Sequence, residues 1–502
     1  MRAAQSACPA VVLSSCDLPD SQQLLLHGCE DCACPVSSDQ RVPSPSVLPF
    51  DVVGDTTRWV CGREVIEIRL DPERRLLFNP VGRSGVVVVN EPARSVFRHF
   101  QRPSTFQDAR RAWPGSDEDL EEVFRRLRQL EMIQPYGQLL HPQFHSNTVL
   151  TAWLHVTNAC NLRCPYCYVN KSNEGMDESV GRAAVEAVIH SAVEHGFSAV
   201  KLKYAGGEAS LNHRLVLSLH AYARALAAQH GLQLHATLLS NGVALSPTLV
   251  EALRSEGIPV MISLDGLGSQ HDTQRPFANG RPSFRFVERT IARLIGQGHA
   301  PHLSITISGR NAAGVADVVR FALEQELTFS LNLFRDNECA ASFPDLRYEE
   351  QAMISALLEA FGVIEEFLPA WSVLGSILDR GQLLRPSQRS CGVGRDYVVV
   401  DQRGRVAKCH MEIEKTLGDV FNDDPVALVW RDEATVQNLP VEEKEGCRDC
   451  TWRYWCSGGC AVATFRATGR YDIKSPNCNI YKAIYPQALR LEGLRLLKYA
   501  AV

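Results

Sequence analysis

The stretch Cys160-Asn-Leu-Arg-Cys164-Pro-Tyr166-Cys167-Tyr168 places three cysteines at C-x3-C-x2-C spacing, directly after the strand-like run 148–156. Thiolates at such short, fixed spacings hold iron–sulfur clusters, and three of them can ligate three corners of a 4Fe–4S cube. The fourth iron is then open to a small molecule. A zinc site is the alternative, but structural zinc usually takes a closed set of four ligands, and no fourth follows here at that spacing. The sequence therefore favours an open cluster.

Composition and charge exclude several classes of protein. The chain has 502 residues, of which 45% are apolar, enough for two to four domains with real cores. A net charge of −5 and a pI near 6.3 give no basic footprint for nucleic acid. No apolar run approaches the roughly 18 residues of a membrane helix. The apolar run 10–13 is too short for a signal peptide.

The chain contains seventeen cysteines and shows no export signal, which favours metal ligation over disulfides. Oxygen-sensitive clusters also need a reducing compartment, so we expect a cytoplasmic protein. Residues 1–50 are rich in Ser, Pro and Cys without a sustained period, which predicts a mobile arm. Within the arm, Cys29, Cys32 and Cys34 are dense enough to bind metal or exchange thiols, but no matching second half lies nearby.

Residues 55–141 show a different pattern, in which short strands precede helices. Three strands followed by helices predict a small winged-helix-like module, bounded by Asp-Pro and Gly-containing turns. The second helix carries Arg125, Arg126 and Arg128, but five acidic residues offset them, which makes it a poor recognition helix for DNA. The predicted strands are 65–70, 76–79 and 86–89, and the predicted helices are 91–100 and 117–130.

Residues 148–335 alternate strand-like and helical runs, which predicts an α/β fold with six parallel βα units. In barrels built from such units, the chemistry lies at the C-terminal ends of the strands. The predicted strands are 148–156, 198–205, 233–239, 259–264, 302–307 and 328–334.

Candidate ligand-binding motifs follow three of these strands. The second strand ends in Gly206-Gly207-Glu208, where glycines allow a ligand to approach the backbone and Glu208 can accept hydrogen bonds from an ammonium group. The third ends in Ser240-Asn241-Gly242. The fourth ends in Ser263-Leu264-Asp265-Gly266, with His271-Asp272 and Arg275 following. Each motif alone is usually a turn, but their placement after successive strands points to one ligand.

A second group of cysteines occupies residues 386–490, after a helical connector predicted at 336–385 and before a short C-terminal tail at 491–502. The run 397–408 reads as a hairpin that brings Cys391 and Cys409 together. The lone Cys339 is expected to be a small buried hydrophobe. Structural zinc is an alternative for the group, since its spacings also suit zinc ribbons. The members are Cys391, Cys409, Cys447, Cys450, Cys456, Cys460 and Cys478.

The C-x3-C-x-aromatic-C motif resembles the signature of the radical S-adenosylmethionine (SAM) superfamily. This resemblance implies a partial (βα)6 TIM barrel over 148–335, whose open iron holds the amino and carboxylate groups of SAM. An electron from the cluster cleaves SAM to a 5′-deoxyadenosyl radical, so Cys160, Cys164 and Cys167 are implied to be catalytic. The implied SAM contacts are Tyr166 near the adenine, Gly206, Gly207 and Glu208 at the amino group, Ser240 and Asn241 near the ribose, and Ser263 and Arg275 near the carboxylate.

The later cysteines, with Gly404 between the first two, resemble the SPASM extension of the same superfamily. This implies two auxiliary 4Fe–4S clusters and three clusters in total. Cys447, Cys450, Cys456 and Cys478 would bind the outer cluster. Cys391, Cys409 and Cys460 would bind the inner one, whose fourth ligand stays open because residues 382–390 contain no cysteine.

The N-terminal module resembles the PqqD-like element of ribosomal-peptide maturases, which binds a leader peptide as an added strand. Together the resemblances predict an oxidoreductase that matures a ribosomally made precursor peptide, forming a carbon–carbon or thioether crosslink. An external donor such as flavodoxin or ferredoxin would supply electrons. Asp396, Asp401, His410 and Glu412 are nearby polar candidates for a base, and His410 fills the position of the catalytic aspartate of sulfatase-maturing relatives. Alternatives are oxidation of a protein side chain or a small molecule, and a non-enzymatic electron carrier with several clusters.

Overall fold

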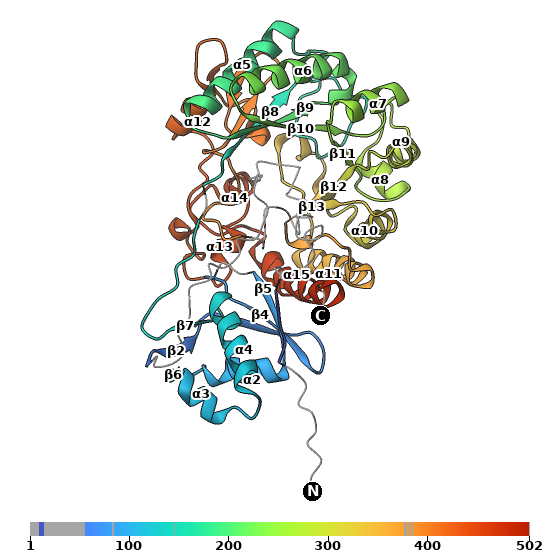
Figure 1. Cartoon of the computed structure of the whole chain (residues 1–502). Helices are drawn as coiled ribbons and strands as arrows, with labels where there is room; N and C mark the ends of the chain where they lie inside the picture. Colours follow the sequence, from blue (N-terminus) through green and yellow to red (C-terminus); the bar gives the residue numbers. More distant parts are fainter. Residues whose placement is uncertain are drawn as a thin grey trace.

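The computed structural model describes residues 10–14, 56–82, 85–144, 146–375, 379, 381, 383 and 385–500. Cys29, Cys32 and Cys34 lie outside these residues. Figure 1 shows the N-terminal module at the foot of the molecule, the α/β part at the top and right, and the cysteine-rich part at the left. Within the described ranges, every helix is too short or too polar to cross a membrane.

The centre of the fold is a nine-stranded sheet with the order β13-β12-β11-β10-β9-β8-β14-β15-β16. Its six strands β8 to β13 are all parallel and follow chain order. They confirm the six predicted strands: β8 (Val149–His155), β9 (Ala199–Ala205), β10 (Gln233–Ser240), β11 (Val260–Ser263), β12 (His302–Ile307) and β13 (Phe329–Leu333).

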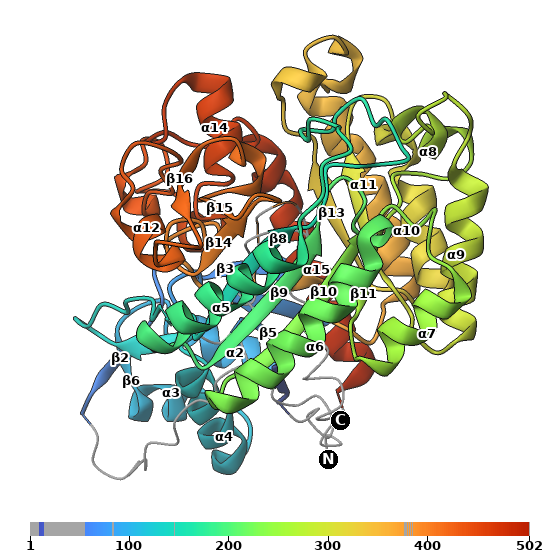
Figure 2. The same cartoon turned by 90° about the horizontal axis from the view of Figure 1, so that it is seen from above.

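The two faces of this sheet differ in chemistry. One face is aliphatic and packs on helices that surround the sheet (Figure 2), which explains the nearly continuous burial of β8 and β9. On the opposite face the strand registers bring polar side chains into rows, such as Lys203 with Thr237 and Ser304 with Ser330. The covering helices are α5 (Glu178–Glu194), α6 (His213–Gln229), α7 (Pro247–Ser255), α8 (Ser269–Gln274), α9 (Phe284–Gly296) and α10 (Val315–Glu324).

The cysteine-rich part is joined to this sheet, although the sequence predicted a separate domain. Strand β14 (Tyr397–Val400) pairs parallel to β8, with Val399 opposite Trp153. The predicted hairpin is confirmed, because β14 pairs antiparallel to β15 (Arg405–Ala407), and β16 (Thr416–Asp419) continues the sheet. The segment bearing Cys391 and Cys409 is therefore fixed to the first strand of the α/β part.

The N-terminal module contains two small sheets, ordered β1-β5-β4-β3 and β6-β2-β7. The predicted strands and helices of this module are present, and three further strands and one short helix were missed. Its elements are β2 (Arg58–Cys61), β3 (Ile66–Arg69), β4 (Arg74–Phe78), β5 (Val86–Asn90), α2 (Glu91–His99), β6 (Ser104–Thr105), α3 (Phe106–Ala112), α4 (Asp117–Gln129) and β7 (Ile133–Pro135).

Three predictions outside these elements differ from the structure. Strand β1 (Val12–Ser14) lies within the segment predicted to be a mobile arm, because its side chains pack into the module. Helix α15 (Cys478–Tyr499) includes most of the predicted C-terminal tail, and Leu496 is fully buried. Cys339 is exposed rather than buried. The predicted helical connector is confirmed by α11 (Glu350–Phe367).

The N-terminal module packs tightly on the cysteine-rich part. The Phe78 ring lies 6.0 Å from Trp452 and 4.8 Å from Trp455, and the Trp455 indole N–H donates to the Pro80 carbonyl at 2.7 Å. Helix α15 adds Gly493, where a Cβ atom would lie 2.9 Å from a Leu76 methyl group. The module is therefore held against the segment that carries the outer cysteines.

Replacing Phe78 by alanine tests this interface. Phe78 is fully buried, so the F78A variant should lose about 3–5 kcal/mol of stability, because the aromatic contacts are removed and a cavity remains. Thermal unfolding of the anaerobic holoenzyme measures the effect. The control L139A removes a side chain that is 65% exposed and should leave the melting temperature unchanged. An equal melting temperature for both variants would contradict the packing described here.

Candidate active site

The loop after β8 carries the three cysteines of the first motif, all of them partly buried. Its backbone continues the β8–β9 ladder beyond the strands. The Gly207 N–H donates to the Thr157 carbonyl at 2.7 Å, and the Glu208 N–H donates to the Ala159 carbonyl at 2.9 Å. The cysteine loop therefore begins as an extension of the sheet, held against the end of β9.

Gly206 and Gly207 permit this close approach. A Cβ atom on Gly206 would lie 2.3 Å from the Thr157 carbonyl oxygen, and one on Gly207 would lie 2.4 Å from the Ala159 carbonyl oxygen. Both contacts are with backbone, which cannot move aside cheaply. The sequence assigned these glycines to a ligand, whereas the structure gives them a second role, which is to let the cysteine loop lie against the strand.

Glu208 connects the ends of two neighbouring strands. Its carboxylate accepts hydrogen bonds from the Ser240 hydroxyl at 2.8 Å, the Asn241 N–H at 2.6 Å and the Ser210 N–H at 3.1 Å. Burial raises the pKa of the carboxyl, and these hydrogen bonds oppose the rise. A carboxylate offers about four acceptor positions, so one is left for an ammonium group.

Asn241 joins the same group of residues to the cysteine loop. Its side-chain amide donates to the side-chain oxygen (Oδ1) of Asn161 at 2.7 Å and lies 3.8 Å from the Cys160 sulfur. The predicted residues Cys160, Glu208, Ser240 and Asn241 are thus brought together by direct contacts.

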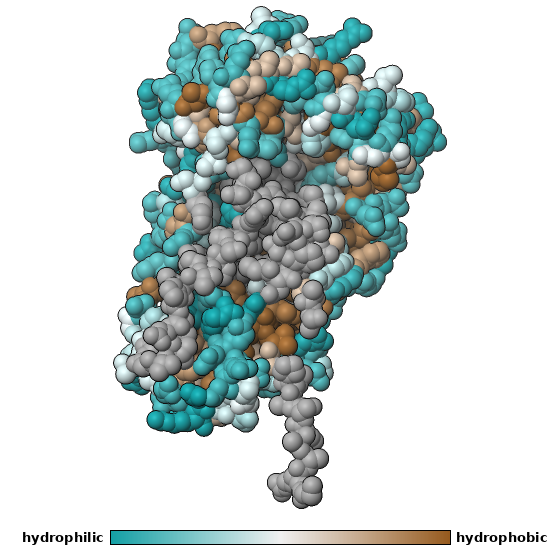
Figure 3. Space-filling model, viewed as in Figure 1, coloured by the Kyte–Doolittle hydropathy of each residue, from teal (hydrophilic) through white to brown (hydrophobic). Residues whose placement is uncertain are grey.

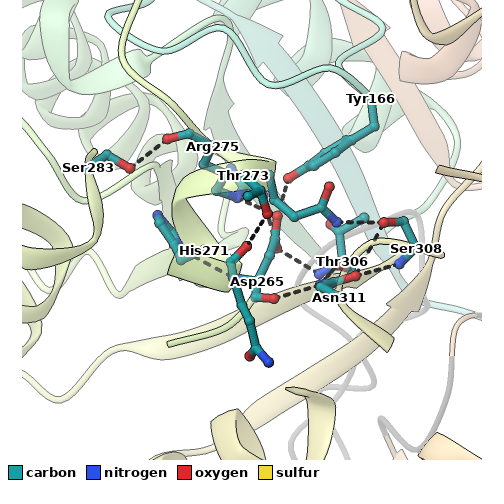
Figure 4. Close-up of polar contacts among 11 residues, drawn as sticks. Tyr166, Asp265, His271, Thr273, Arg275, Ser283, Thr306, Ser308 and Asn311 are labelled. Carbon is teal, nitrogen blue, oxygen red and sulfur yellow. Dashed lines mark hydrogen bonds and ion pairs between the residues drawn. The ribbon is translucent and has the colours of Figure 1, made fainter. Parts of the chain in front are cut away.

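Asp265 organises a second group of contacts, at the end of β11 (Figure 4). Its carboxylate accepts from the Tyr166 hydroxyl at 2.5 Å, from the Arg275 guanidinium at 2.7 Å and from the Thr306 N–H at 2.9 Å. The Asn311 amide donates to the Asp265 carbonyl at 2.6 Å. Sequence reasoning assigned Asp265 no role, and only its place within the motif at 263–266 pointed to it.

Arg275 forms an ion pair with Asp265 in this structure. Burial alone lowers the pKa of the Arg275 guanidinium, but the adjacent Asp265 carboxylate raises it well above the usual value. The guanidinium carbon also lies 5.4 Å from the centre of the Tyr166 ring. The sequence predicted that Arg275 lies near the SAM carboxylate. The structure adds that Arg275 and Asp265 together hold Tyr166, which precedes Cys167 in the sequence.

Lys171 is a partner of the first cysteine set that the sequence missed. Its ammonium group donates to the Cys167 sulfur at 2.8 Å. Burial lowers the pKa of Lys171, but the neighbouring thiols raise it overall, which keeps the side chain charged. No spacing rule marks a lysine four residues after a cysteine, so only the fold reveals this contact.

The later cysteines form two separate groups, as the sequence predicted. Cys391, Cys409 and Cys460 are buried in one apolar group with Trp153 and Tyr397. A second pocket brings together four cysteines and the aromatic residues Trp452, Tyr481 and Tyr485; its cysteines are Cys447, Cys450, Cys456 and Cys478.

Burial keeps several of these thiols protonated unless a metal binds. It raises the pKa of Cys164 and Cys456 to about 12 and that of Cys447 to about 11. Metal binding would therefore displace protons, as thiolate coordination requires.

The sulfurs do not form a compact zinc site as they lie in the structure. Four thiolates around zinc at about 2.3 Å would lie about 3.8 Å from one another. Among the described residues, no three cysteine sulfurs lie within 4.8 Å of one another.

Comparisons with known proteins agree with this chemistry. The radical SAM superfamily model matches residues 154–322, and SPASM, an iron–sulfur cluster-binding domain, matches residues 391–451. An uncharacterized protein of Methanocaldococcus jannaschii is 34% identical over 287 residues, which cover 55% of this chain and 90% of that protein. The chain belongs to the radical SAM superfamily. It is a radical SAM enzyme, and its cofactors are SAM and iron–sulfur clusters.

Two further proteins resemble this radical SAM enzyme. The PqqA peptide cyclase of Xanthomonas campestris pv. campestris is 24% identical over 349 residues, which cover 66% of this chain and 86% of that protein. Among solved structures, anSMEcpe with bound AdoMet and the Cp18Cys peptide gives a TM-score of 0.57 at 19% identity, covering 69% of this chain and 99% of that chain. At that identity, the structural likeness concerns the fold alone.

Aromatic side chains lie between the radical SAM cysteines and the inner SPASM cysteines. His410, which follows Cys409, stacks on Trp153 at 4.5 Å and shares a hydrogen bond of 2.9 Å with the Tyr397 hydroxyl. Its ring centre is 5.6 Å from that of Tyr168, which follows Cys167. The predicted residue His410 therefore lies between the two cysteine sets.

A Gly207→Ala substitution tests the close approach of the cysteine loop. The added methyl group would overlap the Ala159 carbonyl, so the loop must move and the three cysteines lose their spacing. We expect the reconstituted G207A protein to lose about four iron atoms per chain and to produce no 5′-deoxyadenosine. The control G362A lies on α11 with open space around it and should keep both. Full iron content and wild-type SAM cleavage in G207A would show that the loop tolerates displacement.

Proposed function

We propose that this radical SAM enzyme oxidatively modifies a ribosomally made precursor peptide by forming an intramolecular carbon–carbon or thioether crosslink. The observation that carries the proposal is the adjacency of the first cysteine set and the inner SPASM set across Tyr168 and His410. A substrate radical formed beside one set would have an electron acceptor close by at the other. Two similar proteins, the PqqA peptide cyclase and anSMEcpe with a bound peptide, support a peptide substrate.

Each region of the chain has its own role in the proposed reaction. The module at 55–141 is a PqqD-like, winged-helix-like element that holds the leader peptide by strand addition. The six βα units at 148–335 form a partial TIM barrel, which is supported by their parallel order in the sheet. The three cysteine sets hold three 4Fe–4S clusters, one open to SAM and two auxiliary.

SAM, when bound at the open iron, would supply the radical that removes hydrogen from the peptide. The chain's own residues fit this cofactor. Glu208 has an acceptor position for the SAM ammonium group, and Asn241 lies beside Cys160. Tyr166, which precedes Cys167 and is held by Asp265 and Arg275, would lie near the adenine.

His410 is the proposed base that takes the proton released when the substrate radical is oxidised. Of the three other candidates, Asp396 is a buried carboxyl whose pKa is raised by burial, and Asp401 and Glu412 are engaged in structural contacts. Asp401 accepts hydrogen bonds from Arg403 and Arg405 in the hairpin turn, and Glu412 pairs with Arg466. His410 is held against the cysteine loop by Tyr168 and is oriented by the Tyr397 hydroxyl. These contacts favour it as the proton acceptor.

The partners and location follow from this chemistry. An external electron donor such as flavodoxin or ferredoxin would reduce the first cluster. A reducing, cytoplasmic environment would keep the many free thiols and the clusters intact.

Co-expression with a candidate peptide tests the proposed function. A short reading frame next to the gene, encoding a leader and a core rich in Cys or aromatic residues, supplies the peptide. We expect its product to lose two hydrogens and to resist fragmentation between the joined residues in tandem mass spectrometry. A product aldehyde that reacts with hydrazine would instead indicate oxidation of a single side chain. Failure of the anaerobic enzyme to form any 5′-deoxyadenosine would favour an electron carrier.

The His410→Gln variant separates the base from SAM cleavage in the same experiment. H410Q should keep its iron content and its 5′-deoxyadenosine formation but yield far less crosslinked peptide, because the proton has no acceptor. Y397F is the companion variant, since it removes only the hydroxyl that orients His410. Normal crosslinking by H410Q would assign the base elsewhere.

The raised pKa of Glu208 predicts that SAM binding depends on pH. Because burial raises the pKa of Glu208 above the usual 4.5, and its ionised form attracts the SAM ammonium, affinity should increase as pH rises through the raised pKa. The E208Q variant should bind SAM about 10- to 100-fold more weakly, since a charged hydrogen bond is worth about 1.5–3 kcal/mol. Its affinity should also vary less with pH. Anaerobic calorimetry between about pH 5.5 and 8 measures both effects, and identical pH profiles would contradict this role.

A further inference from the structure

The β5 edge of the N-terminal sheet is occupied by a short strand from far upstream in the chain. Strand β1 pairs antiparallel to β5 and places Val12, Leu13 and Ser14 opposite Val89, Val88 and Val87. The next described residue after Ser14 is residue 56. This strand is therefore added to the edge of the sheet much as a separate peptide would be.

Both faces of β1 are buried, in a slot between two helices. Val12 packs with Val89 and Phe124 on the side of α4, and Leu13 packs with Leu76 and Val88 on the side of α15. Both side chains are only 7% exposed. The slot therefore selects two consecutive apolar residues that point in opposite directions, as alternate positions of an extended strand do.

Main-chain contacts fix the start of β1. The Val11 N–H donates to the Asn90 side-chain oxygen at 2.9 Å, and the Asn90 N–H donates to the Val11 carbonyl at 3.2 Å. The same Asn90 oxygen caps α2 through the Ala93 N–H. These contacts involve only backbone atoms of the incoming strand, so they do not depend on its sequence.

The opposite edge of the sheet is less suited to strand addition. Strand β3 exposes the charged residues Glu67 and Arg69, and Glu67 pairs with Arg94 at 2.5 Å. Charged side chains on an edge strand are a common protection against pairing with other chains. The apolar edge at β5 is already filled. Figure 3 shows further apolar surface over the lower part of the molecule, where this sheet lies.

We infer that Val12–Ser14 is a resident strand on the β5 edge, where the leader is proposed to add, and that the leader must replace this strand to bind. The inference rests on the proposed function, because it takes the substrate to be a peptide. The partner is an extended segment with two consecutive apolar residues, the first facing α4 and the second facing α15. Occupation by the chain's own strand lowers the apparent affinity for any leader by competition.

A peptide made from the chain's own sequence tests this exchange. The probe is a fluorescein-labelled peptide of residues 8–18 with both cysteines replaced by serine. It is titrated into the intact holoenzyme, a form lacking residues 1–20, and the full-length variant L13D. We expect binding to the truncated form and to L13D to be at least tenfold tighter than to the intact chain. Hydrogen exchange at residues 86–90 should become faster in both variants and slow again when the probe is added.

Matched controls keep the outcome clear. The variant L139D adds the same charge at an exposed leucine of the region and should bind the probe as weakly as the intact chain. A probe carrying aspartate at both apolar positions should bind none of the proteins. Equal binding to all forms, or no slowing of exchange at residues 86–90, would overturn the inference. Formation of 5′-deoxyadenosine, measured on the same samples, reports folding and the proposed function separately from strand docking.

Discussion

The close approach of two backbone segments, Gly206-Gly207 and residues 157–159, is the constraint on which the active site depends. Hydrogen bonds from Gly207 and Glu208 extend the β8–β9 ladder into the cysteine loop. The strand end therefore sets where Cys160 begins the loop. Glu208, in turn, reaches Ser240 and Asn241 at the end of β10. This ladder, together with Glu208, thus positions the cysteine loop and two of the three strand-end motifs that would surround SAM, those at 206–208 and 240–242.

The parallel pairing of β14 with β8 fixes the position of the SPASM part in the same way, through sheet hydrogen bonds. Because Val399 lies opposite Trp153, the hairpin that carries Cys409 cannot shift without disturbing the first strand. The stacking of His410 on Trp153 depends on that register. The separation between the first and inner cysteine sets is therefore fixed by sheet hydrogen bonds rather than by a flexible linker. A fixed separation would favour electron transfer between the clusters proposed at these two sets.

Local patterns in the sequence predicted most of the fold, and long-range pairings account for what was missed. The six parallel strands were recognisable because each is a short apolar run followed by a turn or cysteine motif. Strand β1 has too few residues to leave such a pattern. Strands β14 and β8 are too far apart in the sequence for their pairing to leave one. The candidate site likewise combines features that local sequence patterns predict with features that depend on long-range contacts. The cysteine sets follow from spacing, whereas the contacts Lys171–Cys167 and Arg275–Asp265 depend on how the loops fold.

Buried positive charge beside the cysteine sets links cluster loading to folding. Lys444 is 1% exposed and donates to the Ser457 carbonyl at 3.2 Å. Burial lowers the pKa of Lys444, and the thiols of Cys447, Cys456, Cys391 and Cys460 oppose that shift when ionised. With protonated thiols, a buried ammonium group has little compensation, which is costly in a protein interior. Thiolates formed on metal binding would stabilise this ammonium group, which would couple metal loading of these cysteines to folding of the segment around Lys444.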